Sequence, residues 1–162
     1  MASQEFLATV LPSSGLYCTV EISTAKREHV FVESIDELYS AAMAFDAKGY
    51  NAFFALASFS TKERKAEYAV KIKSLFLDID CGEGKEYPNK AEAAKALDSF
   101  ITESNLASLG APWIISSGGG LHVYWPFKED VTIEAWKPVA ENLKRLCKKQ
   151  GFRIDAAVTG DA

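Results

Sequence analysis

The segment Ser74-Leu75-Phe76-Leu77-Asp78-Ile79-Asp80-Cys81-Gly82 decides the fold, because an apolar run of strand-like composition ends in two carboxylates. Side chains two residues apart in a strand point to the same face, so Asp78 and Asp80 are predicted to share one face of a sheet. A like-charge pair brings a buried strand no structural benefit, since an unpaired buried carboxylate is costly. Two interpretations stay open: a divalent cation compensates both acids, or the strand frays into a turn where water solvates them.

Composition narrows the class of protein. The chain has 162 residues, of which 48% are hydrophobic and 25% charged, as in an ordinary globular domain. No apolar run approaches the roughly 20 residues that span a bilayer, and no basic segment opens the chain, so we expect a cytoplasmic protein without a membrane partner. The three cysteines, Cys18, Cys81 and Cys147, are too widely spaced for a Cys-x-x-Cys metal site.

The charge is uneven along the chain. The formal net charge of -4 argues against a uniformly basic surface for nucleic acid. Lys and Arg nevertheless outnumber acidic residues within 62–73 and within 137–153. Such clusters could bind a polyanion, although solvated helix faces give the same pattern.

The first half of the chain predicts a mixed α/β module. Residues 16–22 and 29–33 have the composition of short strands. Ser34-Ile35-Asp36-Glu37 is a capping-box pattern that begins a helix, which continues to about residue 48 before Gly49. Residues 51–59 form one apolar run, which predicts a single strand.

The second half predicts the order β-α-β-β-α-β, the split arrangement of ferredoxin-like and RNA-recognition folds. Right-handed crossovers place its first strand between its third and its fourth. Asp78, Asp80, His122 and Asp155 should therefore meet on the open face of one sheet. The predicted strands are residues 73–80, 112–116, 121–127 and 152–158, and the predicted helices are residues 90–104 and 133–150.

Three carboxylates would gather in this arrangement. Asp78, Asp80 and Asp155 offer the oxygen ligands that Mg²⁺ and Mn²⁺ prefer. Two ions about 4 Å apart could stabilise the attacking and leaving oxygens of an in-line phosphoryl or nucleotidyl displacement. For Asp155 the alternative is an ordinary aspartate at a turn or strand end.

A glycine-rich turn is the second signal. Ser117-Gly118-Gly119-Gly120 exposes backbone N–H groups with no side chains in the way, which suits phosphate oxygens, and its glycines tolerate positive φ. A flexible hairpin uses the same residues. His122, one of two histidines in the chain, follows the turn directly and is predicted to donate a hydrogen bond to a phosphate.

These motifs, in this order, resemble those of the archaeo-eukaryotic primase superfamily. Asp78-Ile79-Asp80 ends a strand, Ser117-Gly118-Gly119-Gly120-Leu121-His122-Val123-Tyr124-Trp125 follows, and Ile154-Asp155 comes last. The middle motif is the most distinctive, and it is most similar to that of the primase-polymerases of phages, plasmids and other mobile elements. Many relatives have glutamate at the position of Asp80, which leaves the metal preference open.

The resemblance implies an architecture and a reaction. The architecture is α/β (α+β): an N-terminal α/β module, residues 1–70, packs on an RNA-recognition-like module, residues 71–162, with the active site between them. Asp78, Asp80 and Asp155 would hold two Mg²⁺ or Mn²⁺ ions, and Ser117 and His122 would contact the nucleotide phosphates. The enzyme would extend a primer, or join a first nucleotide, with NTP or dNTP on a single-stranded or primed DNA template.

The resemblance also implies a biological setting. A phage or plasmid would encode the protein, which would replicate DNA in the cytoplasm of its host cell. Relatives commonly continue past the third aspartate with a helical domain or a helicase, so we expect this chain to be the catalytic core of a longer protein.

Basic side chains complete the predicted site. Arg64 and Lys85 are candidates for contacts with the nucleotide, because they precede or follow the first acidic motif. Lys144, Arg145 and Lys148 on the last helix could follow a template backbone. A solvated surface explains isolated basic residues equally well.

Two other functions were compared. A phosphatase of the haloacid dehalogenase type also has a strand ending in Asp-x-Asp, but Cys81-Gly82 follows here and the glycine hairpin has no counterpart there. An RNA-recognition-type module would bind single strands on sheet aromatics without catalysis. The three acids argue against it, since they would repel RNA phosphates, and the sequence is not expected to place strand-centre aromatics beside them.

Overall fold

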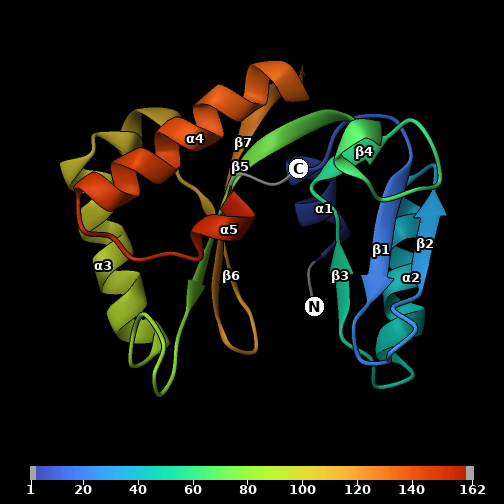
Figure 1. Ribbon diagram of the computed structural model, residues 1–162, viewed down its shortest axis with the longest axis horizontal. Helices are drawn as coiled ribbons and strands as arrows, with labels where there is room; N and C mark the ends of the chain where they lie inside the picture. The colour runs from blue at the N-terminus through green and yellow to red at the C-terminus, as the bar shows by residue number, and fades with distance from the viewer. Residues whose placement is uncertain (1–2, 160–162) are drawn as a thin grey trace. The chain divides into compact units, whose positions relative to one another are not determined.

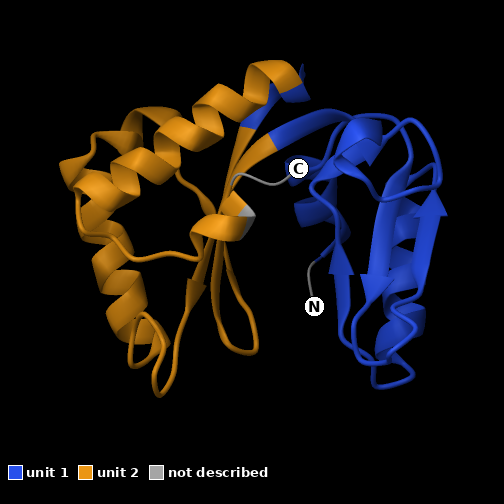
Figure 2. Ribbon diagram, in the orientation of Figure 1, with its two compact units in different colours: residues 1–73, 127–133, 162 blue, residues 74–126, 134–161 orange. Residues whose placement is uncertain are grey.

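Two β-sheets organise the chain in the computed structural model, which describes residues 3–159. The strand orders are β2-β1-β3 and β4-β5-β7-β6 (Figure 1). The described residues form two units: unit 1 comprises residues 3–73 and 127–133, and unit 2 comprises residues 74–126 and 134–159 (Figure 2). The sequence predicted a single boundary, after residue 70. The mixed α/β fold class is confirmed.

Unit 1 is a three-stranded antiparallel sheet with helices packed on it. Helix α2 packs on all three strands, and α1 packs on α2. The predicted cap is confirmed, because Ser34 Oγ accepts a hydrogen bond from Glu37 N–H (3.2 Å). Its elements are α1 (Gln4–Val10), β1 (Tyr17–Glu21), β2 (His29–Val32), α2 (Ile35–Asp46) and β3 (Ala52–Phe54).

The single strand predicted for residues 51–59 is wrong. The segment divides into β3, which pairs with β1, and β4 (Ala57–Phe59), which pairs with β5. Between them Ala55 N–H donates to Cys18 O (2.9 Å). Ala55 and Leu56 are buried, as are the residues of β4, so hydrophobicity marks no break.

Glu21 fastens the turn between β1 and β2. Its buried carboxylate accepts hydrogen bonds from the N–H groups of Ser23 (2.9 Å), Thr24 (2.9 Å) and Glu28 (3.1 Å), and from the Thr24 hydroxyl. The Thr24 hydroxyl and these N–H groups hold the pKa of Glu21 at about 2, against the opposing effect of burial.

Glu21→Gln is therefore expected to lower the melting temperature at pH 7 and to lose that effect in acid. A depressed carboxyl pKa contributes stability above the unfolded pKa of about 4.3, and this stability disappears as the pH falls toward the folded pKa. Thermal unfolding between pH 7 and pH 2 measures the difference. Glu28→Gln, which leaves the Glu28 backbone donor in place, is the matched control. A constant difference across this pH range would contradict the role given to Glu21.

Unit 2 follows the predicted order β-α-β-β-α up to its second long helix, but not the final strand. Helices α3 and α4 lie on the same side of its strands (Figure 1). Asn89 Oδ1 caps α3 by accepting from Glu92 N–H (2.9 Å), and β5 is adjacent to β7, which pairs with β6. This part of the predicted strand order is confirmed. The elements are β5 (Ala69–Asp80), α3 (Lys90–Glu103), β6 (Trp113–Ser116), β7 (Gly120–Thr132) and α4 (Ile133–Lys149).

Helix α4 is anchored to the sheet by Trp136. The indole is buried and donates its N–H to Ser74 O (2.9 Å), which satisfies its polar atom. The segment after α4 is held by aromatic rings, since Phe152 stacks on Phe100 with ring centroids 4.6 Å apart. These contacts place the chain after α4 beside the end of β5.

The final strand predicted for residues 152–158 is wrong. Residues 152–155 are not in a strand, and α5 (Ala156–Thr159) follows them. Asp155 Oδ1 accepts from Ala157 N–H (3.0 Å), a local bond that favours helix over strand. One backbone bond still connects this segment to the sheet: Asp155 N–H donates to Asp78 O (2.9 Å). Asp78 and Asp155, which the sequence predicted to be neighbours, therefore lie side by side although residues 152–155 form no strand with β5.

Within residues 3–159, no helix has both the length and the apolar character needed to cross a membrane.

Candidate active site

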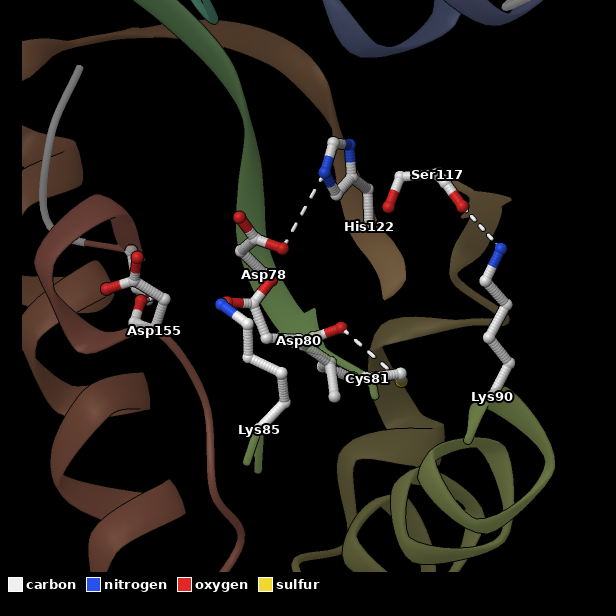
Figure 3. Close-up of polar contacts among 10 residues, drawn as sticks. Asp78, Asp80, Cys81, Lys85, Lys90, Ser117, His122 and Asp155 are labelled. Atoms are coloured by element: carbon white, nitrogen blue, oxygen red, sulfur yellow. Dashed lines mark hydrogen bonds and ion pairs between the residues drawn. The ribbon is translucent and has the colours of Figure 1, made fainter. Parts of the chain in front are cut away.

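The end of β5 carries the two acids of the first motif. Ile79 is fully buried, whereas Asp78 and Asp80 on the opposite face are partly exposed. His122 lies on the neighbouring strand β7, with its Nε2 atom 3.6 Å from Asp78 Oδ1 (Figure 3). The side chains of His122 and Asp78 are 21% and 25% exposed, so a ligand can still reach this pair.

The environment of Asp78 disfavours its charge. Burial raises the pKa of Asp78, and the negative charges of Asp80, Asp155 and Glu86 raise it further, while His122 opposes them. The same carboxylate, together with burial, raises the pKa of Tyr124 on β7. Burial is the largest of these effects on Asp78, and the neighbouring carboxylates add to it.

Lys85 is the cation nearest to Asp80. Its Nζ lies 3.0 Å from Asp80 Oδ2, and in Figure 3 the side chain runs beside Asp80 on the side of Asp155. Lys85 belongs to the loop between β5 and α3, which lines an open pocket together with Arg153. The structure thus brings the predicted nucleotide contact Lys85 to the acids.

The glycine turn contacts β5 through its last residue. A Cβ on Gly120 would collide with the carbonyl of Ile79, at 2.9 Å from its carbon, and would lie 3.2 Å from Asp80 Cα. Gly118 and Gly119 have open space around them. None of the three has the positive φ for which the sequence suggested them. Gly120 is required by the close approach of two backbones, whereas Gly118 and Gly119 are exposed.

Lys90 was missed by sequence reasoning. The first residue of α3 extends its ammonium group to the turn, where it donates to Ser117 O (Figure 3). It also donates to Ser116 Oγ (2.8 Å). The available signal was its position, because a cation in the first turn of a helix opposes the helix dipole. Within the described residues, the Ser117 hydroxyl makes no hydrogen bond and is available to a ligand.

The donor set has the chemistry for a hard divalent ion. Asp78, Asp80 and Asp155 supply carboxylate oxygens, and a buried oxygen of Glu86, whose charge acts on Asp78, has no hydrogen-bond partner among the described residues. Between residues 3 and 159, however, no three His, Cys, Asp or Glu side chains gather closely enough to hold a metal ion. Asp155 Oδ1 accepts a hydrogen bond from Ala157 N–H at the start of α5, and Asp80 Oδ2 forms an ion pair with Lys85. The three-carboxylate site remains a prediction.

Aromatic rings lie beside the acids, contrary to the sequence-based expectation. The Phe76 ring is 5.0 Å from Tyr124 and 5.5 Å from His122, centroid to centroid. Phe76 precedes Asp78 by one strand repeat, and the alternation that put the acids on one face also puts Phe76 there. Tyr124 is only 4% exposed, whereas Phe76 is partly exposed and offers accessible aromatic surface.

Comparison with known proteins finds similarity in structure but not in sequence. No protein-family model matches the chain, and no curated protein matches it significantly. The AEP domain of the cyanophage S-2L primase-polymerase (PrimPol) superposes on 86% of this chain with a TM-score of 0.50. The chain has a primase-polymerase-like fold. Identity is 16% and the match spans 66% of that domain, so the likeness concerns the fold alone.

The remaining basic candidates lie elsewhere in the primase-polymerase-like fold. Arg64 belongs to unit 1, whereas the acids, the turn and His122 belong to unit 2. On α4, Lys144 Nζ pairs with Glu141 Oε1 (3.3 Å) and Arg145 Nε donates to Glu141 O (3.4 Å). Lys148 lies in the last turn, where the helix dipole favours a cation. Structural roles therefore exist for the α4 residues, and their contacts with nucleic acid remain predictions.

Proposed function

We propose that this chain is the catalytic core of a template-dependent nucleotidyl transferase, a primase-polymerase. The observation that carries the proposal is the meeting of Asp78 with His122 across adjacent strands, with Asp155 bonded to the Asp78 backbone. Residues far apart in sequence thus converge on one accessible face of unit 2. The primase-polymerase-like fold supports the same reaction class.

In the proposed reaction, the 3′-oxygen of a primer or first nucleotide attacks the α-phosphorus of a bound NTP or dNTP. The bond to the pyrophosphate oxygen breaks, and the hydroxyl proton leaves to solvent. Two ions, Mg²⁺ or Mn²⁺, held by Asp78, Asp80 and Asp155, would supply charge neutralisation at the phosphates. The residues of the chain would do the rest by positioning the nucleotide.

The turn and His122 would hold the triphosphate. Ser117 is partly exposed and Gly118 and Gly119 are exposed, so the Ser117 hydroxyl and the backbone N–H groups of the turn would donate to phosphate oxygens. His122 Nε2 would donate to a phosphate oxygen once it leaves Asp78. Lys85 and Arg64 would add positive charge, and Lys144, Arg145 and Lys148 would contact a DNA template. The partners would be single-stranded or primed DNA and, in a longer protein of a phage or plasmid, a helicase.

A primer-extension assay tests the proposal. Wild-type protein is expected to extend a labelled primer with dNTP or NTP only when Mg²⁺ or Mn²⁺ is present, and His122→Ala is expected to lower the rate about 100-fold. His29→Ala, which removes the only other histidine, should retain activity, since His29 lies on β2 of unit 1. Absence of metal-dependent product, or full activity of His122→Ala, would refute the proposal.

The second candidate is a single-strand-binding module without catalysis. The partly exposed ring of Phe76 beside the acids favours it, because bases stack on such rings. Binding of a fluorescent oligonucleotide, measured with and without divalent ions, separates the two functions. Metal-independent binding that Phe76→Ala abolishes, together with no product, would favour the binding module.

A further inference from the structure

The Lys90 side chain connects helix α3 to the glycine turn. Its ammonium group donates to the hydroxyl of Ser116 and to the carbonyl of Ser117, on either side of the point where β6 enters the turn. All three residues belong to unit 2, as do the acids and His122. Lys90 is partly buried, so water competes less for its hydrogen bonds than at an open surface.

Helix stability does not explain this lysine. Lys90 is the first residue of α3, where the N-terminal end of the helix dipole disfavours a cation. Asn89 already caps the helix through Glu92 N–H. The contacts with the turn are therefore the interactions that compensate an unfavourable position.

The glycine turn is held in two places, by contacts with the end of β5 and by the Lys90 side chain from helix α3. On the β5 side, Cys81 N–H donates to Gly119 O (2.8 Å) and Gly120 lies against the Ile79–Asp80 backbone. Within the turn, Ser117 N–H donates to Gly120 O (3.0 Å). A Cβ on Gly118 would meet no other atom within 4 Å, and among the described residues no side chain other than Lys90 bonds to the Ser116–Ser117 side of the turn.

We propose that Lys90 is a positioning residue, which fixes the Ser117 backbone so that its hydroxyl and the adjacent glycine N–H groups face the nucleotide triphosphate. The inference rests on the proposed function, and Lys90 lies outside the three sequence motifs that suggested that function. Lys90 acts through the turn, because its ammonium group is already engaged by Ser116 and Ser117. The nucleotide would meet a turn arranged before it binds, which lowers the entropy cost of binding.

Steady-state primer extension measures the consequence. Lys90→Met keeps the aliphatic stem and removes the donors, and it is expected to raise the KM for the nucleotide about tenfold with a smaller change in kcat. Lys90→Arg should restore most of the affinity, because a guanidinium can reach the same acceptors. Lys95→Met, an exposed lysine on the same helix, is the matched control.

A double variant separates positioning from direct contact with the phosphates. If Lys90 acts through the turn, Ser116→Ala raises the KM by a smaller factor, and Lys90→Met with Ser116→Ala is no worse than Lys90→Met alone. Effects of Ser116→Ala and Lys90→Met that multiply independently would place Lys90 on the substrate and overturn the inference. An unchanged KM in Lys90→Met would overturn it as well.

Hydrogen exchange tests whether Lys90 holds the glycine turn, without relying on activity. The amides of residues 116–120 should exchange faster in Lys90→Met than in wild type or Lys95→Met, while the rest of unit 2 is unchanged. Equal exchange would refute this role of Lys90 even in an active enzyme. If the amides exchange faster in Lys90→Met but the wild-type protein makes no product, the proposed function is refuted and the role of Lys90 in holding the turn is retained.

Discussion

Asp78→Asn is expected to abolish metal-dependent nucleotide addition, with a loss on the order of 10³-fold, and to raise the melting temperature in metal-free buffer. The loss of activity follows from removing one of the three carboxylates proposed to hold the metal ions, the one that lies 3.6 Å from His122 Nε2. The gain in stability follows from removing a charge that burial and neighbouring carboxylates oppose.

The pH dependence has a definite sign. Because the pKa of Asp78 is raised, the folded chain binds its proton more tightly than the unfolded chain does. Stability is therefore lost as the pH rises from the unfolded pKa of about 3.9 through the folded value. Asp78→Asn should match wild type in acid and exceed it at neutral pH.

Thermal unfolding with and without Mn²⁺ measures the effect. Mn²⁺ should raise the melting temperature of wild type and not that of Asp78→Asn, because an ion that binds the folded state stabilises it. Asp98→Asn on the exposed face of α3 is the matched control. A variant less stable than wild type at neutral pH, in metal-free buffer, would show that Asp78 has a structural role.

Gly120→Ala is expected to destabilise unit 2 by about 3 kcal/mol. The added methyl group would meet backbone atoms of Ile79 and Asp80, which cannot rotate away as a side chain could. For a chain of this size the melting temperature should fall by about 6–12 °C.

Gly118→Ala and Gly119→Ala provide the controls within the same turn. Both positions have open space and neither has a positive φ, so each alanine should leave the melting temperature nearly unchanged. Differential scanning fluorimetry of the three variants is sufficient. Equal melting temperatures for all three would contradict the close approach of the turn to β5.

The sequence predicted the placement of the candidate side chains where a local pattern has one structural outcome. Alternation placed Asp78 and Asp80 on one face, and the order of elements predicted that β7, which carries His122, would adjoin β5. The strand expected at residues 152–158 was mispredicted: residues 152–155 are irregular, and a hydrogen bond from Ala157 N–H to the Asp155 side chain favours the short helix α5 after them.

Contacts that depend on three-dimensional reach were not predictable. Nothing in the sequence pairs Lys90 with Ser117, because a flexible side chain leaves one helix and contacts a hairpin more than twenty residues later. The need for glycine at position 120 was likewise attributed to backbone conformation, whereas the cause is the distance to β5. The aromatic neighbours of the acids followed from alternation and were overlooked.

Strands β5 and β7 each contribute residues to both units, and this limits how the gene can be dissected. Asp130, in the part of β7 that belongs to unit 1, accepts from Ser13 N–H (2.9 Å) and from the Ser13 hydroxyl (2.7 Å). A fragment that stops at Lys73 would lack this partner, and one that starts at Ser74 would carry residues 127–133 without theirs. Neither unit is a cassette that recombination at a single junction could transfer to another protein.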